Sequence, residues 1–140
     1  MKVLFSQDVL MKAVSGGVGD RDISVLLNCC QDGKIRGFAC NHSIMALSAV
    51  LDREDFSRSV SILTCLLELI DVSCYEIRLA LKCDDFEAGL DQIVARRHRL
   101  DRIVTQRQIT AINSKIEVCD PAQLRRELED GKTSQQRRDL

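Results

Sequence analysis

Short apolar runs alternate with amphipathic segments along the chain. The runs contain three to five residues, which is too short for helices and typical of strands that are buried on both faces of a parallel sheet. We expect five strands, at residues 3–5, 36–40, 69–72, 102–105 and 115–118.

Between these runs, apolar residues recur at spacings of three and four, which is the pattern of one buried helix face. Gly33 follows the first such segment, and the Asp120-Pro121 pair opens the last, as expected at a helix end and a helix start. The helices are expected at residues 23–30, 41–51, 55–68, 75–82, 84–98 and from 120 onward.

Alternation of strands and helices predicts an α/β protein with three layers, in which a central parallel sheet of about five strands lies between helices. In such sheets the functional crevice lies beyond the carboxyl ends of the strands, where the strand order reverses. We therefore expect functional side chains just after the strands and at the start of the 84–98 helix.

The helix expected at residues 55–68 is apolar over more than half of its circumference. Phe56, Val60, Ile62, Leu63 and Leu66 all belong to it. A helix of this kind is buried on two sides, either within its own fold or by a second subunit. The pattern therefore indicates a homo-oligomer as one form that the protein can take.

Composition narrows the class without identifying it. The 140 residues, 45% of them hydrophobic, fit one globular domain. We place this domain at residues 1–129, followed by a mobile tail at 130–140 that carries almost no apolar residue. With 20 basic and 21 acidic side chains, the net charge of −1 argues against binding nucleic acid through bulk charge.

No membrane span or signal peptide is expected, and the seven cysteines are scattered without a Cys-x-x-Cys pair. We therefore expect a cytoplasmic protein with reduced cysteines, rather than a disulfide framework or a zinc site.

Five segments, in order along residues 1–128, resemble the PIN-domain family, the metal-dependent ribonucleases of many bacterial toxin–antitoxin pairs. The segments are MKVLFSQDVL (1–10), GKIRGF (33–38) followed by Ser43, DDFEAGL (84–90), RIVTQR (102–107) and IEVCDPAQL (116–124). The resemblance implies the PIN fold and a pocket in which three or four carboxylates bind Mg²⁺ or Mn²⁺, hard cations that prefer oxygen ligands.

Matched residue by residue, this chain lacks those carboxylates. The positions at which the family carries acids fall on Ser6, near Ser48 or Ala49, and on Ala88, Arg107 and Thr110. Arg107 would place a positive charge where the family binds its metal. Two unit charges about 4 Å apart repel by roughly 4 kcal/mol at an effective dielectric constant near 20, and a divalent ion doubles this value.

Other acids near the crevice could form a displaced site, namely Asp8, Asp84, Asp85, Glu87 and Asp91. Asp8 and Asp85 are the best residual candidates. The competing interpretation is structural, because Asp84, Asp85 and Glu87 lie in the first turn of a helix whose last turn carries arginines. Acids at the first turn and bases at the last are what the helix dipole favours without any bound ligand.

Several arginines could bind RNA, and Arg97, Arg99 and Arg107 are the candidates. The competing interpretation is a solvated helix end with ion pairs. The chain has no Trp and one Tyr, Tyr75, so the sequence gives no support for stacking on bases.

These observations predict a degenerate, non-catalytic PIN-like protein, a pseudo-nuclease without a metal or other cofactor, which acts by binding. Its partners would be a second copy, a small antitoxin-like or other protein, or RNA, and no membrane. The alternative is a metal-dependent (Mg²⁺ or Mn²⁺) endoribonuclease of the toxin type that uses relocated acids.

Overall fold

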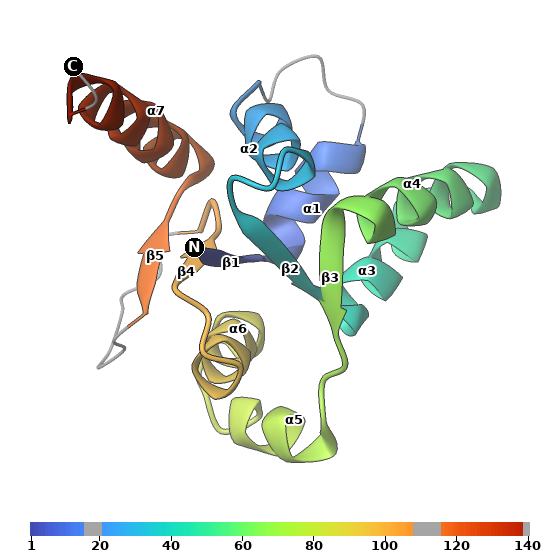
Figure 1. Cartoon of the computed structure of the whole chain (residues 1–140). Helices are drawn as coiled ribbons and strands as arrows, with labels where there is room; N and C mark the ends of the chain where they lie inside the picture. The colour runs from blue at the N-terminus through green and yellow to red at the C-terminus, as the bar shows by residue number, and fades with distance from the viewer. Residues whose placement is uncertain (16–20, 108–115, 139–140) are drawn as a thin grey trace.

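The computed structural model of the chain describes residues 1–15, 21–107 and 116–138, with side chains up to Gly131. Its strands form one parallel sheet in the order β3-β2-β1-β4-β5, which confirms the predicted fold class (Figure 1). The strands are β1 (Lys2–Phe5), β2 (Arg36–Cys40), β3 (Leu67–Ile70), β4 (Arg102–Val104) and β5 (Glu117–Cys119).

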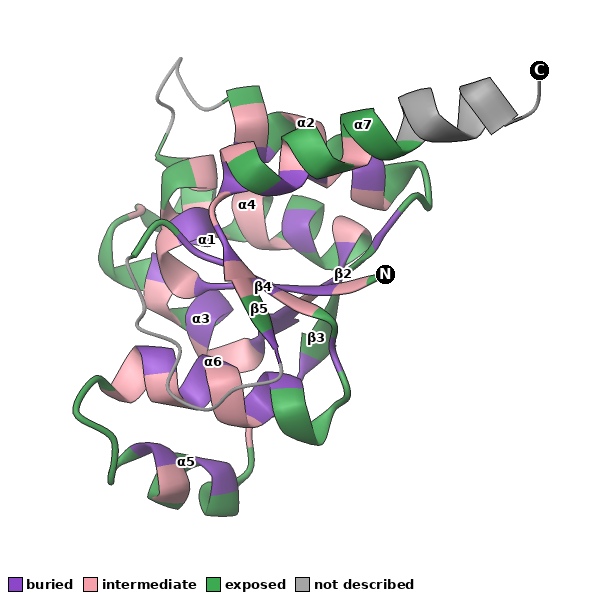
Figure 2. Cartoon of the chain, turned by 90° about the vertical axis from the view of Figure 1, so that its left-hand side faces the viewer, coloured by how far each residue is buried: buried purple, intermediate pink, exposed green. Residues whose placement is uncertain are grey.

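Helices cover both faces of this sheet, as Figure 2 shows for α2, α4 and α7 on one side and α5 and α6 on the other. They are α1 (Gln7–Val14), α2 (Arg21–Gln31), α3 (Asn41–Ala46), the 3₁₀ turn η1 (Leu47–Ala49), α4 (Arg53–Leu66), α5 (Cys74–Ala80), α6 (Phe86–Arg97) and α7 (Pro121–Arg138).

The core has two parts because successive strand residues point to opposite faces of the sheet. In β1, Val3 and Phe5 pack with α1, α2 and α7 on one face. Leu4 packs with α5 and α6 on the other. All three side chains are buried, so β1 is the central strand of a three-layer protein.

The strand order reverses between β1 and β4. The chain passes outward from β1 through β2 to β3 and then returns, so that β4 lies on the opposite side of β1. Because all pairings are parallel, the carboxyl ends of β1 and β4 meet at the same edge of the sheet. This is the position at which open α/β sheets bind ligands.

Several element boundaries differ from the predicted ones. Helix α1 was not expected, although Val9 and Leu10 are fully buried and Val14 completes the helical spacing of this apolar face. Helix α4 ends at Leu66, and β3 begins two residues earlier than predicted. Helix α7 continues to Arg138, so it does not end at the predicted domain boundary after residue 129.

The prediction that the helix over residues 55–68 is buried on two sides is wrong within a single chain. Only Leu63 of α4 is buried, and the side chain of Ile62 is 55% exposed. Phe56, Val60 and Leu66 are partly buried against the core, so the helix packs on one side only. Burial by a second subunit stays a prediction.

Candidate functional site

A small pocket lies at the strand-order reversal, and three segments far apart in the sequence supply its walls. The end of β1 and start of α1, the first two turns of α6 and the residues after β4 contribute the following side chains: Ser6, Gln7, Asp8, Glu87, Ala88, Asp91, Thr105 and Arg107. The cavity that these side chains leave has a volume of about 10 Å³. This is room for about one water molecule, so the side chains themselves fill the site.

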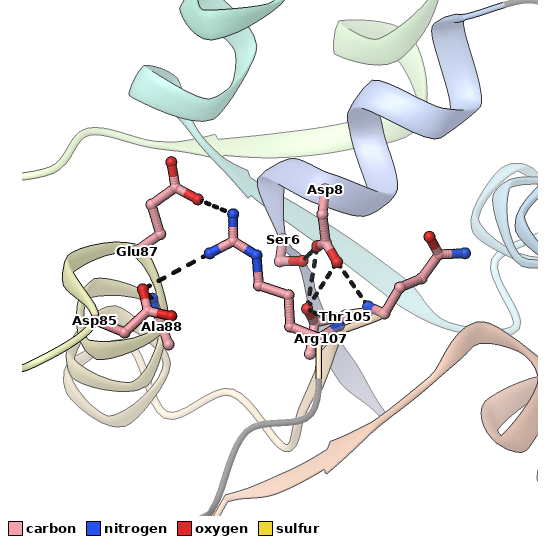
Figure 3. Close-up of polar contacts among 8 residues, drawn as sticks. Ser6, Asp8, Asp85, Glu87, Ala88, Thr105 and Arg107 are labelled. Carbon is pink, nitrogen blue, oxygen red and sulfur yellow. Dashed lines mark hydrogen bonds and ion pairs between the residues drawn. The ribbon is translucent and has the colours of Figure 1, made fainter.

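Asp8 joins the two strand ends that form this pocket (Figure 3). Its carboxylate accepts hydrogen bonds from the Ser6 hydroxyl, from Thr105 Oγ1 at 3.0 and 3.1 Å, and from the backbone N–H of Gln106 at 2.7 Å. The donors come from the ends of both β1 and β4. Asp8 therefore holds the two ends of the sheet together and has its oxygens engaged by uncharged donors.

Arg107 crosses the pocket and places its guanidinium between Glu87 of α6 and Asp85, the residue that caps this helix (Figure 3). Its Nη2 donates to Glu87 Oε2 at 2.5 Å, and its Nη1 lies 3.7 Å from Asp85 Oδ1. Burial lowers the pKa of the guanidinium, but Glu87, Asp85 and Asp8 together raise it above its ordinary value. The side chain thus stays charged and serves as the cation of this acidic site.

Asp85 has a second, structural contact. Its carboxylate accepts a hydrogen bond at 3.2 Å from the backbone N–H of Ala88 and so caps the start of α6. The sequence allowed two interpretations of this acid, as part of a binding site or as a residue that stabilises the start of a helix. The structure shows contacts of both kinds. Asp85 is bound to the helix end and is close to the Arg107 guanidinium.

Asp91 is the acid that the residue-by-residue matching passed over. It follows Ala88 by one turn of α6, and helical side chains lean toward the amino end of their helix, so its carboxyl group lies over the turn that contains Ala88. The residue is 6% exposed. Its carboxyl group forms no hydrogen bond to another residue that the structure describes. Burial, followed by the charges of Asp8 and Glu87, raises its pKa to about 7.

We tested this arrangement against the divalent metal that the PIN resemblance implies. Ser6 donates to Asp8, Ala88 offers no ligand atom, and Arg107 brings a positive charge between the carboxylates. Within the part of the chain that the structure describes, no group of three His, Cys, Asp or Glu side chains can hold a metal ion. The residues in this arrangement do not fit the metal. Thr110, the remaining predicted position, lies outside the described residues.

The three predicted RNA-binding arginines do not lie together. Arg107 is at the amino end of α6, whereas Arg97 and Arg99 are at its carboxyl end, and twelve residues of helix span about 18 Å. Arg99 has a positive φ of 56° and follows the helix end. The carboxyl end of α6 is therefore a separate surface.

Tyr75, which the sequence could not connect to the arginines, lies under Arg97. The guanidinium carbon of Arg97 is 5.0 Å from the centre of the Tyr75 ring, and both side chains are exposed. The residues are 22 positions apart and meet only because α5 packs against α6. No signal in a single sequence reports this contact.

Glu76 is buried between these two helices. Its Oε1 accepts hydrogen bonds at 2.9 Å from the backbone N–H and the hydroxyl of Ser73, the capping residue of α5. Arg97 Nη1 lies 3.8 Å from this oxygen, and His98 Nε2 lies 3.6 Å from Oε2. A single carboxylate thus holds α5 against the end of α6.

A larger, open groove of about 460 Å³ lies beside the small pocket. Met11 and Val50 supply apolar walls, while Lys12, Asp8 and Arg107 supply charges. The groove connects the face of α1 to the pocket, because Asp8 and Arg107 line both. It is a surface on which a peptide or side chain from another molecule could reach Arg107.

The sheet order and the pocket at its reversal point define a PIN-like α/β protein, as the resemblance implies. One solved structure with this fold is VapBC2 from Rickettsia felis bound to a DNA fragment from their promoter. One of its chains is 14% identical, with a TM-score of 0.65 over 86% of this chain and 98% of the other. The Mycobacterium tuberculosis toxin VapC20, which cleaves the sarcin-ricin loop, is 13% identical, with a TM-score of 0.53 over 72% of this chain and 86% of the other. At these identities the likeness establishes the fold alone.

No protein-family model and no curated protein match this sequence. Among the helices that the structure describes, none combines the length and the apolar character that crossing a membrane requires.

Proposed function

We propose that this chain is a non-catalytic PIN-like protein that acts by binding another protein. The observation that carries the proposal is the position of the Arg107 guanidinium, 2.5 Å from Glu87 and 3.7 Å from Asp85 in the pocket at the strand-order reversal. A covalently attached cation neutralises these carboxylates without the cost of binding an ion from solution. The family's mechanism requires a metal there to generate the attacking hydroxide.

Two observations support an antitoxin-like partner: the proteins that share this fold, and a groove beside Arg107. The family that the sequence resembles belongs to many bacterial toxin–antitoxin pairs, and the Rickettsia felis neighbour VapBC2 was solved bound to a DNA fragment from their promoter. In the present chain, the groove lined by Met11, Val50 and Lys12 opens beside Arg107 and offers both apolar and charged contacts to a partner segment. Recognition of this kind commonly seats an amphipathic segment in a hydrophobic groove.

A cleavage assay tests the proposal. The chain is incubated in Mn²⁺ with structured and single-stranded RNA, and the Asp91→Asn and Asp8→Asn variants are run beside it. The proposal expects any trace of cleavage to be the same in all three proteins, as for a contaminant. Cleavage by the unmodified chain that disappears in both variants would overturn it.

The second candidate is a metal-dependent ribonuclease with relocated acids, and Asp91 favours it. Asp91 is 6% exposed, its carboxyl group has no hydrogen bond to another residue that the structure describes, and it lies over the turn at which the family carries an acid. It shares the pocket with Asp8, so two carboxylates would face any cation that displaced Arg107. The same cleavage assay distinguishes the two candidates, because only this one predicts cleavage that depends on Asp91 and Asp8.

A further inference from the structure

The surface where the start of α5 meets the end of α6 gathers basic side chains around the one tyrosine of the chain. Figure 1 shows the two helices side by side at the bottom of the view. We call this surface the α5–α6 patch, and its side chains, all of them exposed, are Tyr75, Arg78, Arg96, Arg97 and Arg99. Arg78 follows Tyr75 by three residues, so the two lie on the same side of α5.

Most of the positive charge of this patch is not neutralised by the chain itself. Within the part of the chain that the structure describes, no carboxylate pairs with the side chains of Arg78, Arg96 or Arg99. An arginine on another surface behaves differently, since Arg125 binds Asp22 at 2.7 Å. Three cations without a neighbouring anion create a local positive potential although the net charge of the chain is −1, and such a potential attracts a polyanion.

Arg97 and Tyr75 form a stacked pair whose geometry is fixed from below. The guanidinium carbon lies 5.0 Å from the ring centre, while Nη1 donates to Ser73 Oγ at 3.4 Å and lies 3.8 Å from Oε1 of the buried Glu76. The ring itself stays accessible, because Tyr75 is 59% exposed. Aromatic rings and guanidinium planes held in this way are the surfaces on which unpaired bases stack.

Arg99 occupies a backbone position that suits glycine. Its φ is 56°, and the N–H of Leu100 donates to Ala95 O at 2.8 Å, which closes the end of α6 in a Schellman motif. Glycine is usual at this position because any side chain strains the left-handed conformation. An arginine here lowers folding stability and places an unpaired cation beside Arg97, and strain of this kind is a pointer to function.

We propose that the α5–α6 patch binds single-stranded nucleic acid, with a base stacked on Tyr75 and Arg97 and neighbouring phosphates bound by the unpaired arginines. An acidic peptide would meet the arginines equally well, but it has no regular series of flat groups for the stacked pair. The patch is about 18 Å of helix away from the pocket at the amino end of α6. The proposal therefore goes beyond the protein binding proposed above and requires neither a metal nor cleavage.

Fluorescence anisotropy of the full chain with a labelled oligouridylate, in buffer that contains EDTA, tests the stacking. The single strand should bind with a dissociation constant on the order of 10⁻⁵ M at low salt, and a duplex RNA of the same length should bind more weakly. Tyr75→Ala should weaken binding of the single strand by roughly 5-fold or more, whereas Tyr75→Phe, which keeps the ring, should retain the affinity.

Arg99→Gly should change stability and binding in opposite directions. The urea midpoint should rise, because glycine accepts the left-handed conformation, while the slope of log K against log salt should fall by about 0.7 as one phosphate contact is lost. A variant that is more stable and yet binds more weakly does not owe its loss to misfolding. The matched control is Arg53→Gly, an exposed arginine at the start of α4, which should leave affinity and slope unchanged.

Three results would contradict the proposal. They are no binding of the single strand at low salt, equal affinities of Tyr75→Ala and Tyr75→Phe, and an unchanged salt slope in Arg99→Gly. Competition by polyglutamate as strong as that by unlabelled oligouridylate would also contradict it, and would assign the patch to an acidic peptide instead. Each result is distinct from the outcome of the cleavage assay, because EDTA prevents metal-dependent cleavage and no variant used here touches the pocket.

Discussion

Each end of helix α6 carries a cluster of charged side chains, and the sign of the central residue differs between the two clusters. At its amino end one cation, Arg107, lies among the acids Asp85, Glu87 and Asp91. At its carboxyl end one acid, Glu76, lies beside the guanidinium of Arg97 and the imidazole of His98. The central residue is partly exposed in the first cluster, with 43% of the Arg107 side chain accessible, and almost fully buried in the second.

This difference in burial separates a site from a structural contact. A partly exposed guanidinium on a flexible side chain can be exchanged for another cation or for a partner's group with little loss of stability. A buried carboxylate that caps one helix and faces an arginine and a histidine of the next cannot be removed without leaving those contacts unpaired. We therefore expect loss of the buried Glu76 carboxylate to alter stability and changes at the amino end to alter binding.

The largest effect is expected for Glu76→Ala. This change removes the acceptor of two hydrogen bonds from Ser73 and the acid beside Arg97, and it leaves a gap between α5 and α6. The free energy of unfolding should fall by about 3 to 5 kcal/mol in urea titrations. The control is Glu54→Ala, an exposed acid of α4 whose loss should cost less than about 0.5 kcal/mol.

Asp91→Asn should change how stability depends on pH. The pKa of Asp91 is about 7 in the folded chain and near 3.8 when unfolded, so between these values only the folded state holds the proton. Stability contributed by this group is full below pH 4, falls as the pH rises to about 7, and is lost above it.

The free energy of unfolding should fall by on the order of 2 to 4 kcal/mol between pH 4 and pH 7 because of this group. Asp91→Asn should abolish this pH dependence and make the chain more stable than the unmodified protein at pH 8. Urea titrations at pH 5, 6, 7 and 8 measure it, with the exposed Asp32→Asn as the control. An unchanged slope in Asp91→Asn would show that the buried carboxyl group does not take up a proton.

Arg107→Gln should affect binding more than folding. The exposed ion pairs that it removes stabilise the chain by about 1 kcal/mol or less. The carboxylates of Asp85, Glu87, Asp91 and Asp8 would then lack their cation, so Mn²⁺ should bind at least about tenfold more tightly than to the unmodified chain. Calorimetry with Arg96→Gln as the control measures this gain, and equal affinities in all three proteins would contradict the assignment of Arg107 as the pocket's cation.

The smallest effect is expected for Tyr75→Ala at the exposed contact with Arg97. Loss of this cation–π pair should cost about 0.5 to 1 kcal/mol, measured by a double-mutant cycle with Arg97→Ala. A coupling energy as large as the loss of unfolding free energy expected for Glu76→Ala would contradict the division between exposed and buried contacts.

The strands and the pocket position could be predicted from the sequence, because short apolar runs and the strand-order rule are local or general signals. The start of β3 was predicted two residues too late because the charged Glu68 resembles the polar end of a helix, whereas it lies within β3 between Leu67 and Leu69. Asp91 was predicted to lie near the crevice, but its place beside Ala88 was not, because matching one position at a time does not show that a side chain one helical turn later reaches the same place. The Tyr75–Arg97 pair could not be predicted, because it depends on the packing of α5 on α6, and the spacing of residues along the sequence does not report that packing.

The calorimetric titration of the unmodified chain with Mn²⁺ is the most direct test of the account. Because Arg107 already supplies the positive charge in the pocket, the titration should show no binding up to millimolar Mn²⁺ at pH 7.5. A stoichiometric site with a dissociation constant in the micromolar range, lost in Asp91→Asn, would contradict the account and establish a working metal centre.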